Sequence, residues 1–396
     1  MSFYSEPAFF VIVAILAVPG ILMGLAGRSS KRYGLAVSII MLAALFCRDV
    51  PGALAFGVFL AVSCATTAAT LHWFRTNNPH AVALYRCALL VAILPLICAK
   101  VSAVFDTNLL GFLGISYLTF KSVQVLIEIR DGLIKEMPPL DYLYFLLFFP
   151  TFTSGPIMRS RDFVKQINKP LSRDEYLDLL ARGIGWLALG VLYSFVLATL
   201  FQWLQWFGPS ALGADGAGAI AGQLIQCVCY GLHLFFDFAG YSFMAMGVGA
   251  ALGVRVPTNF RRPFLSIDIK DFWNRWHITL SYWLRDFVFM RLSSVFLSHK
   301  VFKSRLTTAC VSFIINMGVM GLWHGLTPDY IVYGLYHGCL LAACELFQKK
   351  SKFYKKYRKT RWFKACSWAI TMIAVFFGFS LFSGQVSSLL IGVING

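Results

Sequence analysis

The amino-acid sequence predicts an all-α integral membrane protein with about eleven transmembrane helices and one membrane domain over residues 1–396. Hydrophobic residues make up 58% of the chain and charged residues 13%, whereas a soluble domain has about 25% charged residues. The mean hydropathy is +0.69. Apolar runs recur from residue 8 to residue 395 with only short polar connections, so no separate soluble domain is expected.

A membrane-spanning helix needs about 20 mostly apolar residues. Segment 8–27 is too long for the core of a signal peptide and follows Glu6 rather than a basic residue, so it is expected to remain as a span. Residues 142–157 and 272–290 are aromatic but short or interrupted by charge, which favours re-entrant or interfacial helices. The eleven predicted spans are residues 8–27, 33–47, 50–72, 87–105, 109–127, 183–207, 217–236, 238–254, 306–322, 329–347 and 365–383.

Basic residues concentrate in three connections, Arg28–Arg32, Arg159–Arg182 and Lys349–Lys364. Short basic loops face the cytoplasm, so both termini are expected on the extracytoplasmic side. The net charge of +17 is explained by this topology, and no nucleic-acid partner is expected. Ten scattered cysteines lack metal-ligand spacing, so no metal site is expected. The connections expected outside are poor in basic residues and lie near Asp49, Asp106, residues 206–215 and residues 327–329.

Two of the seven histidines stand out by their surroundings. His277 lies in the motif of residues 271–281, between two tryptophans and a helix-like run that alternates charged and aromatic residues. An interfacial anchor is the alternative interpretation of that segment. His324, between Trp323 and Gly325, has no charged neighbour until Asp329. A neutral imidazole in such a pocket can act as a base, and ionisable residues at membrane depth are functional-site candidates.

The other histidines have plainer interpretations. His233 and Asp237 are four residues apart, which predicts a polar pair on one helix face. His337 is flanked by small residues and is expected to pack between helices, with a place in the site as the alternative. The remaining three, expected to be solvated near the membrane interface, are His72, His80 and His299.

The sequence has no nucleophile elbow, zinc-protease helix, Walker loop or dinucleotide-binding glycine motif. The remaining possibility is a histidine that removes a proton from an incoming hydroxyl. The acceptor itself then attacks an activated acyl group. This chemistry is direct acyl transfer without a covalent enzyme intermediate. Glycines that permit close helix approach or a ligand channel occur at positions 321, 325, 334 and 338.

The motif of residues 271–281, together with Trp323-His324-Gly325, resembles the membrane-bound O-acyltransferase family, and in particular its D-alanyl transfer branch. The alginate-type O-acetyltransferases of the family continue with a proline-leucine-glycine-glycine turn where this chain has Phe289-Met-Arg-Leu292. The motif-bearing core spans about residues 115–340. The supporting stretches are residues 128–134, 148–156, 235–241, 259–264 and 285–291.

The resemblance implies a ring of about eleven helices around a thin partition, with an outer funnel and an inner dock, in the bacterial cytoplasmic membrane. It implies that His324 is the catalytic base and that His277 lines a thioester tunnel. D-alanine would arrive on the 4'-phosphopantetheine of an acidic DltC-like carrier protein, and this chain would bind no cofactor of its own. The acceptor would be teichoic or lipoteichoic acid, with DltD-like and small DltX-like membrane proteins and membrane lipid as partners. The other residues assigned to the substrate tunnel are Trp273, Asn274, Trp276, Ser281, Trp323, Asp237 and Tyr241.

A basic, aromatic surface is predicted to receive the carrier. Opposite charge would steer an acidic protein to it, and the tryptophans would then be buried. Its basic residues are Arg261, Arg262, Lys270 and Arg275. The alternative is that these charges only enforce topology.

Three other functions remain open at this stage. One is O-acetylation of a polysaccharide, as in the alginate-type enzymes. Another is transport of an activated lipid intermediate, which would favour inverted repeats that the sequence does not display. The third is a scaffolding subunit with an inactive site.

Overall fold

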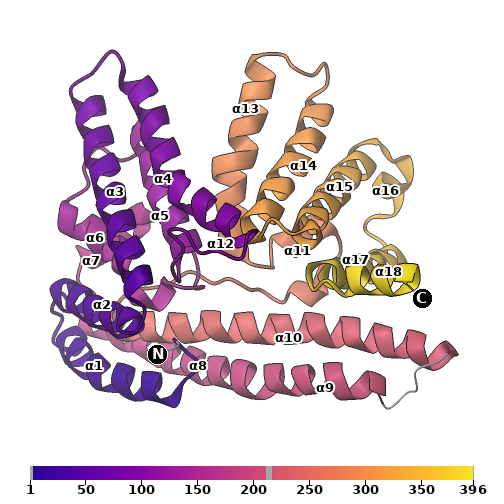
Figure 1. Cartoon of the computed structure of the whole chain (residues 1–396), viewed down its shortest axis with the longest axis horizontal. Coiled ribbons are helices and arrows are strands. Elements are labelled where there is room, and N and C mark those ends of the chain that lie inside the picture. The colour runs from indigo at the N-terminus through magenta and orange to yellow at the C-terminus, as the bar shows by residue number, and fades with distance from the viewer. Residues whose placement is uncertain (1–2, 211–215, 396) are drawn as a thin grey trace. The chain divides into compact units, whose positions relative to one another are not determined.

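A computed structural model of the chain describes residues 3–210 and 216–395. Every regular element in these ranges is a helix (Figure 1), which confirms the predicted all-α class. The chain forms two compact units, one of Met1–Val191 and Tyr241–Thr258 and the other of Leu192–Gly240 and Asn259–Gly396. A single membrane domain stays a prediction.

The α-helices that lie wholly in the first unit have between 8 and 26 residues. Its helices are α1 (Pro7–Leu25), α2 (Lys31–Phe46), α3 (Val50–Arg75), α4 (Ala81–Ala103), α5 (Ile115–Arg130), α6 (Pro139–Leu147), the 3-10 turn η1 (Phe149–Thr151), α7 (Ser160–Ile167) and α8 (Arg173–Val191). The long helix α10 (Gly216–Ala251) begins in the second unit and ends in the first.

The second unit holds both motif histidines. Its helices are the π-helix η2 (Leu192–Ala198), α9 (Thr199–Ser210), the 3-10 turn η3 (Pro263–Leu265), α11 (Ile269–Trp273), α12 (Ile278–Leu284), the π-helix η4 (Arg285–Phe289), α13 (Met290–Ser298), α14 (Arg305–His324), α15 (Pro328–Lys350), α16 (Lys352–Tyr357), α17 (Arg361–Phe382) and α18 (Gln385–Asn395). The predicted outer connection 206–215 lies partly outside the described residues.

Eight helices in the described ranges are long and apolar enough to cross a membrane, so a multi-pass membrane protein is confirmed and the predicted total of eleven is not. Two predicted spans correspond to α2 and α5, which have 16 residues each and are short of a full crossing. The prediction of separate spans at 217–236 and 238–254 is wrong, because both belong to the continuous helix α10.

The two predicted spans are separated at Asp237, the charged residue that lies between them. The side chain of Asp237 is exposed, and its Oδ1 accepts a hydrogen bond from Ser194 at 3.3 Å. The helix therefore continues past the charge without burying it. The side of the membrane on which each terminus lies stays a prediction.

Helix α5 lies inside the first unit, since nearly all its residues from Ile115 to Ile129 are buried. Its Lys121 donates to the carbonyls of Phe145 at 3.0 Å and Leu146 at 3.4 Å, and so satisfies the last carbonyls of α6. The predicted re-entrant segment 142–157 is broken into α6 and η1 and is largely buried. Its short, interrupted form is confirmed.

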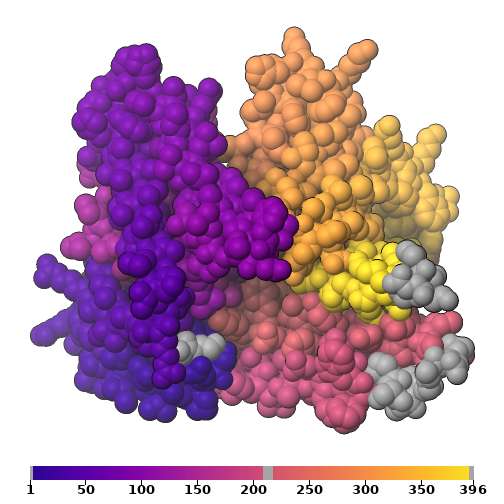
Figure 2. All heavy atoms as spheres, viewed as in Figure 1, coloured from indigo at the N-terminus to yellow at the C-terminus, as the bar shows by residue number. Residues whose placement is uncertain are grey.

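In the second unit, α14 and α15 form a tight hairpin that carries His324 and His337. A methyl group on Gly321 would lie 2.4 Å from the carbonyl oxygen of Tyr330, and one on Gly334 would lie 2.5 Å from that of Met317. Only glycine permits this approach. The helices α17 and α18, in yellow, lie beside the orange α14–α15 hairpin (Figure 2).

Candidate active site

His277 lies between the end of α11 and the start of α12. The backbone of His277 has φ 42° and ψ 52°, a left-handed conformation that costs a non-glycine residue about 1–3 kcal/mol. Asn259 compensates for this cost: its carbonyl accepts from Ile278 N at 2.9 Å, and its Oδ1 accepts from Thr279 N at 3.3 Å. Backbone strain that is held in this way is common at functional sites.

The hydrogen bonds of Asn259 also fix the proton on His277. The backbone N–H and the hydroxyl of Thr279 both approach Oδ1 of Asn259, at 3.3 and 2.6 Å, so that atom is the amide oxygen. Nδ1 of His277 lies 3.3 Å from the same oxygen and must donate its proton to it. Nε2 of His277 therefore carries a lone pair and can accept a proton or a hydrogen bond.

His277 is neutral in this position. Its side chain is 4% exposed, and the ring of Phe238 packs edge-on against it at 4.7 Å. Burial, followed by the electrostatic effect of His324, lowers the pKa of His277 to about 3.

His324 is the last residue of α14, and its ring is half-buried among aromatic side chains. The ring centre lies 4.6 Å from that of Trp323, 5.0 Å from Phe382 and 6.4 Å from Tyr333. Because the helix ends here, the imidazole is presented at the helix terminus instead of within the bundle. Its role as a base stays a prediction.

A third histidine belongs to the same group. His337 is fully buried, and neither ring nitrogen has a hydrogen-bond partner among the described residues. Its ring contacts Trp273 at 5.2 Å and Tyr333 at 4.7 Å. A chain of rings therefore runs from the His277 motif through His337 and Tyr333 to His324. Sequence analysis favoured a packing role for His337, and only its four-residue spacing from Tyr333 could have signalled this position.

A cavity of about 240 Å³ opens beside this group. Two of its lining residues, Trp273 and Asn316, each carry a buried polar atom without a partner in the described residues, the indole N–H and Oδ1. Sequence analysis missed Asn316. Four predicted site residues line the cavity: Lys270, Trp273, Asn274 and Ser281. The other residues that line it are Tyr282, Leu284, Arg285, Phe289, Phe313, Met317 and Leu341.

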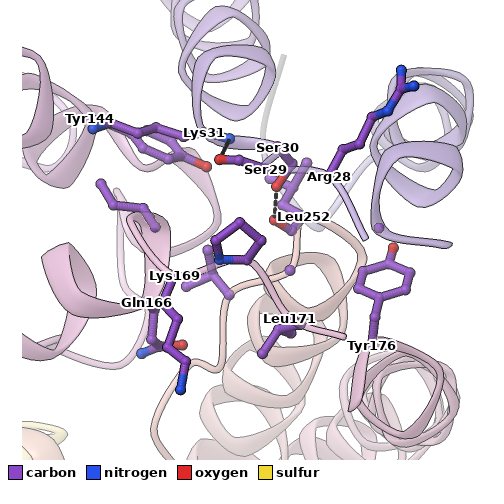
Figure 3. A pocket seen from close by; sticks show the side chains of 15 residues that line it. Arg28, Ser29, Ser30, Lys31, Tyr144, Gln166, Lys169, Leu171, Tyr176 and Leu252 are labelled. Atoms are coloured by element: carbon purple, nitrogen blue, oxygen red, sulfur yellow. Dashed lines mark hydrogen bonds between the residues drawn. The ribbon is translucent and has the colours of Figure 1, made fainter. Parts of the chain in front are cut away.

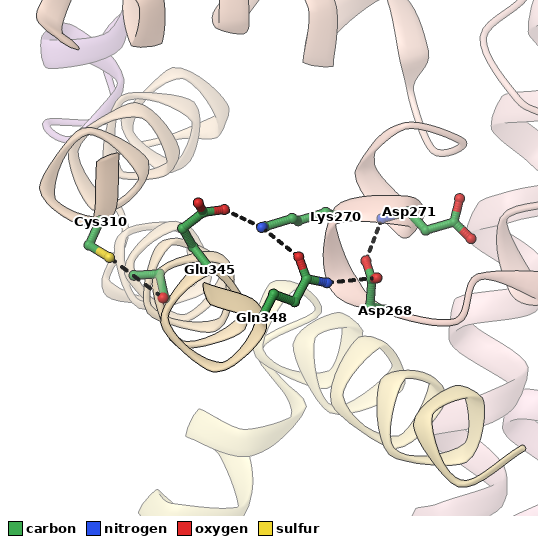
Figure 4. Close-up of polar contacts among 7 residues, drawn as sticks. Asp268, Lys270, Asp271, Cys310, Glu345 and Gln348 are labelled. Carbon is green, nitrogen blue, oxygen red and sulfur yellow. Dashed lines mark hydrogen bonds and ion pairs between the residues drawn. The ribbon is translucent and has the colours of Figure 1, made fainter. Parts of the chain in front are cut away.

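Polar contacts tie the motif to α15 (Figure 4). Lys270 pairs with Glu345 and donates to Gln348 at 2.8 Å, and Gln348 donates to Asp268 at 3.0 Å. Asp268 also caps α11 by accepting from Asp271 N at 2.8 Å. These bonds hold α11, and with it Trp273, against the helix that carries His337.

The four residues predicted to receive a carrier differ in their surroundings. Lys270 is paired with Glu345, and Arg275 is paired with Asp271 at 2.7 Å. Arg261 and Arg262 are exposed. A partner would therefore meet the positive charge of Arg261 and Arg262 more directly than that of the two paired residues.

The remaining predicted site residues lie in other surroundings. Trp276 is buried and stacks on Phe272 at 5.5 Å, as a core residue. Tyr241 belongs to the first unit, where it shares a hydrogen bond with Thr153. The expected His233–Asp237 pair is not formed: His233 bonds to the carbonyl of Ala198 at 3.0 Å and Asp237 bonds to Ser194. Helix spacing put both on one face, but η2 supplies a nearer partner to each.

The first unit has a small cavity of about 30 Å³ lined by Arg28, Lys31 and Lys169 (Figure 3). Lys31 donates to Oδ1 of Asn168 at 2.7 Å, and Ser30 donates to the carbonyl of Leu252 at 2.8 Å. Two basic connections predicted to face the cytoplasm thus meet on one side of this unit. Among the described residues, no group of three or more His, Cys, Asp or Glu could hold a metal ion.

The eight long apolar helices in the described ranges define a multi-pass membrane protein, and its second unit brings three histidines into one group of aromatic rings. The chain belongs to the membrane-bound O-acyltransferase family, whose model matches residues 74–391, and it is an acyltransferase. The resemblance to the D-alanyl transfer protein DltB is confirmed by similarity over most of the chain.

Three relatives are each named teichoic acid D-alanyltransferase. The one from Bacillus subtilis (strain 168) is 41% identical over 394 residues, which cover 97% of this chain and 98% of the relative. The one from Streptococcus thermophilus is 45% identical over 312 residues, 76% of this chain and 75% of the relative. The one from Lacticaseibacillus rhamnosus is 35% identical over 400 residues, 98% of both.

Proposed function

We propose that the chain transfers D-alanine from the phosphopantetheine thioester of an acidic DltC-like carrier protein to a hydroxyl of teichoic or lipoteichoic acid. One observation carries the proposal: ring contacts run from Trp273 of the His277 motif through His337 and Tyr333 to His324, in the same unit as a cavity that Trp273 lines. The names of the three relatives supply the acyl group and the acceptor class.

The cavity is suited to the pantetheine arm, which contains two amides. The indole N–H of Trp273 would donate to an amide carbonyl of the arm, and Oδ1 of Asn316 would accept from an amide N–H. A buried polar atom without a partner costs about 1–3 kcal/mol, so a ligand that satisfies both atoms recovers that cost. The apolar side chains of Phe289 and Phe313 would pack along the methylene groups.

His324 is the proposed base. Its imidazole takes the proton of the acceptor hydroxyl as the oxygen attacks the thioester carbonyl carbon. The new C–O bond forms, the C–S bond breaks, and the departing thiolate receives the proton from the imidazolium. His277, with its Nδ1 proton bonded to Asn259, uses Nε2 to orient the reacting groups.

The donor would enter from the cytoplasmic side and the acceptor from outside, with both termini outside. Arg261 and Arg262 are proposed as the charges that steer the carrier, because both are exposed. DltD-like and DltX-like proteins would receive or relay the product. The membrane is proposed to be the bacterial cytoplasmic membrane.

The purified chain in lipid nanodiscs, given carrier loaded with radiolabelled D-alanine and purified lipoteichoic acid, tests the proposal. Label should pass to lipoteichoic acid as an alkali-labile ester, and carrier loaded with acetate should be a poor donor. Release of the label as free D-alanine, with none in lipoteichoic acid, would show hydrolysis of the thioester and contradict esterification of the acceptor. Preferred transfer of acetate would favour the O-acetyltransferase alternative.

A further inference from the structure

A second cavity of the same unit lies between α10 and the turn that joins α17 to α18, with a volume of about 420 Å³. Gln223, Gln226 and Tyr230 line it from one face of α10, since their spacing of three and four residues aligns them. Gln385 lines it from the start of α18, and Trp206 of α9 adds an indole. The mechanism above makes no use of these residues.

The glutamines form a defined network. The amide nitrogen of Gln385 donates to Oε1 of Gln223 at 2.8 Å, to its carbonyl at 3.1 Å and to Oε1 of Gln226 at 3.2 Å. These bonds use the side-chain oxygens of Gln223 and Gln226. Their NH₂ groups are the donors that such a network leaves for a ligand.

The cavity adjoins the surroundings of His324. Ser383, which lines it, follows directly after Phe382, whose ring lies 5.0 Å from that of His324. Tyr230 lines the cavity and is close enough to Tyr330 to interact with it electrostatically. A hydrogen bond from Ser387 to Asp329 holds the start of α18 against the first turn of α15. A ligand in the cavity would therefore lie near the proposed base.

The chemistry of the cavity selects its ligand. The described residues that line it are amides, hydroxyls, Trp206 and Leu389, and none is charged. A phosphate group needs Arg, Lys or a comparable cluster of donors. Amide donors with an aromatic face instead match neighbouring hydroxyl groups and the C–H face of a sugar or polyol.

We propose that this cavity is an acceptor subsite, which binds a neutral polyhydroxyl unit of the acceptor and brings another of its hydroxyls to His324. The inference rests on the proposed function for the identity of the acceptor, and on the cavity alone for its chemistry. The phosphate groups of an anionic polymer would remain outside this subsite.

Saturation-transfer NMR of the nanodisc-embedded chain tests it, with maltose as the neutral probe and inorganic phosphate as the charged one. The maltose signal should fall at least several-fold in Gln226→Ala/Gln385→Ala. It should also fall in Gln226→Glu, which keeps the side-chain size and replaces the NH₂ donor with an oxygen. Gln166→Ala, in the first unit, should leave the signal unchanged, and thermal unfolding would establish that each variant is folded.

A maltose signal that survives in both variants, or a phosphate signal that depends on the same glutamines, would overturn the proposal. Maltose binding requires no acyl donor, so this result stands apart from the transfer assay. Normal transfer to lipoteichoic acid without any maltose signal would remove the subsite and leave the proposed function intact.

Discussion

Nδ1 of His277 lies 3.3 Å from Oδ1 of Asn259, the same oxygen that accepts from both donors of Thr279. A single buried amide therefore sets the proton position of a motif histidine and supports its left-handed backbone. The sequence places these residues 18 positions apart, and only the fold joins them.

Asn259→Ala should reduce acyl transfer by roughly 10-fold or more, because it removes a buried acceptor worth about 1–3 kcal/mol and releases the tautomer of His277. Transfer rates at saturating donor would measure the loss. Thr279→Ser retains the hydroxyl and should remain near the original rate. An Asn259→Ala enzyme as fast as Thr279→Ser would contradict the positioning role.

Gly321→Ala should destabilise the second unit by about 1–3 kcal/mol, the usual range for an overpacked core. The added methyl group would lie 2.4 Å from a carbonyl oxygen of α15, so the hairpin must open. Gly318→Ala is the matched control on the same helix, because the nearest atom to its methyl group is 3.7 Å away. Thermal unfolding in nanodiscs should separate the two variants, and equal midpoints would contradict the close approach.

Lys270→Met should lower stability by about 1–3 kcal/mol, because it leaves the carboxylate of Glu345 without its cation. The double variant Lys270→Met/Glu345→Met should lose less stability than the sum of the losses in the two single variants, as measured by thermal unfolding.

Arg261→Glu/Arg262→Glu should weaken carrier binding, most strongly at low salt, and leave the unfolding midpoint nearly unchanged. Weaker carrier binding in Lys270→Met than in the arginine variant would contradict the assignment of carrier steering to Arg261 and Arg262.

His277 should contribute to the pH dependence of stability. Its pKa is about 3 in the folded protein and about 6.5 in a solvated chain, so the unfolded chain binds the proton more readily. Stability is then complete above about pH 6.5 and decreases as the pH falls from there toward about 3. The unfolding midpoint of His277→Gln should fall less on acidification than that of the unchanged chain, and parallel curves would argue against a neutral, buried ring.

The sequence predicted the helical class and the position of His324 between two apolar helices, since both depend on local composition, but it predicted one helical segment over residues 272–290 where α11 ends before His277 and α12 begins after it. It could not predict the continuity of α10, because the partner of Asp237 is Ser194, 43 residues away. It also could not predict that Lys270 pairs with Glu345, because Glu345 is 75 residues away. Contacts of this kind decide whether a charge is available, and they arise only when helices pack.

Contacts between packed helices also explain why the sequence did not identify His337 and Asn316 as residues of the site. Neither residue has a motif neighbour that identifies it, yet His337 lies against Trp273 and Asn316 lines the cavity beside it. Their burial is set by the α14–α15 hairpin and by α17, where Gly378 lies directly against the imidazole of His337. Helix packing, and not local sequence, brings these side chains to the site.

The most direct test of the central claim is a single-turnover measurement of D-alanyl transfer from loaded carrier by the His324→Ala chain. General base catalysis contributes about 10²–10⁴-fold to a rate, so the variant should lose at least about 100-fold in rate while its unfolding midpoint stays close to that of the unchanged chain. His299→Ala, at the exposed end of α13, should transfer normally. A His324→Ala rate within a few-fold of the His299→Ala rate would show that His324 is not the base.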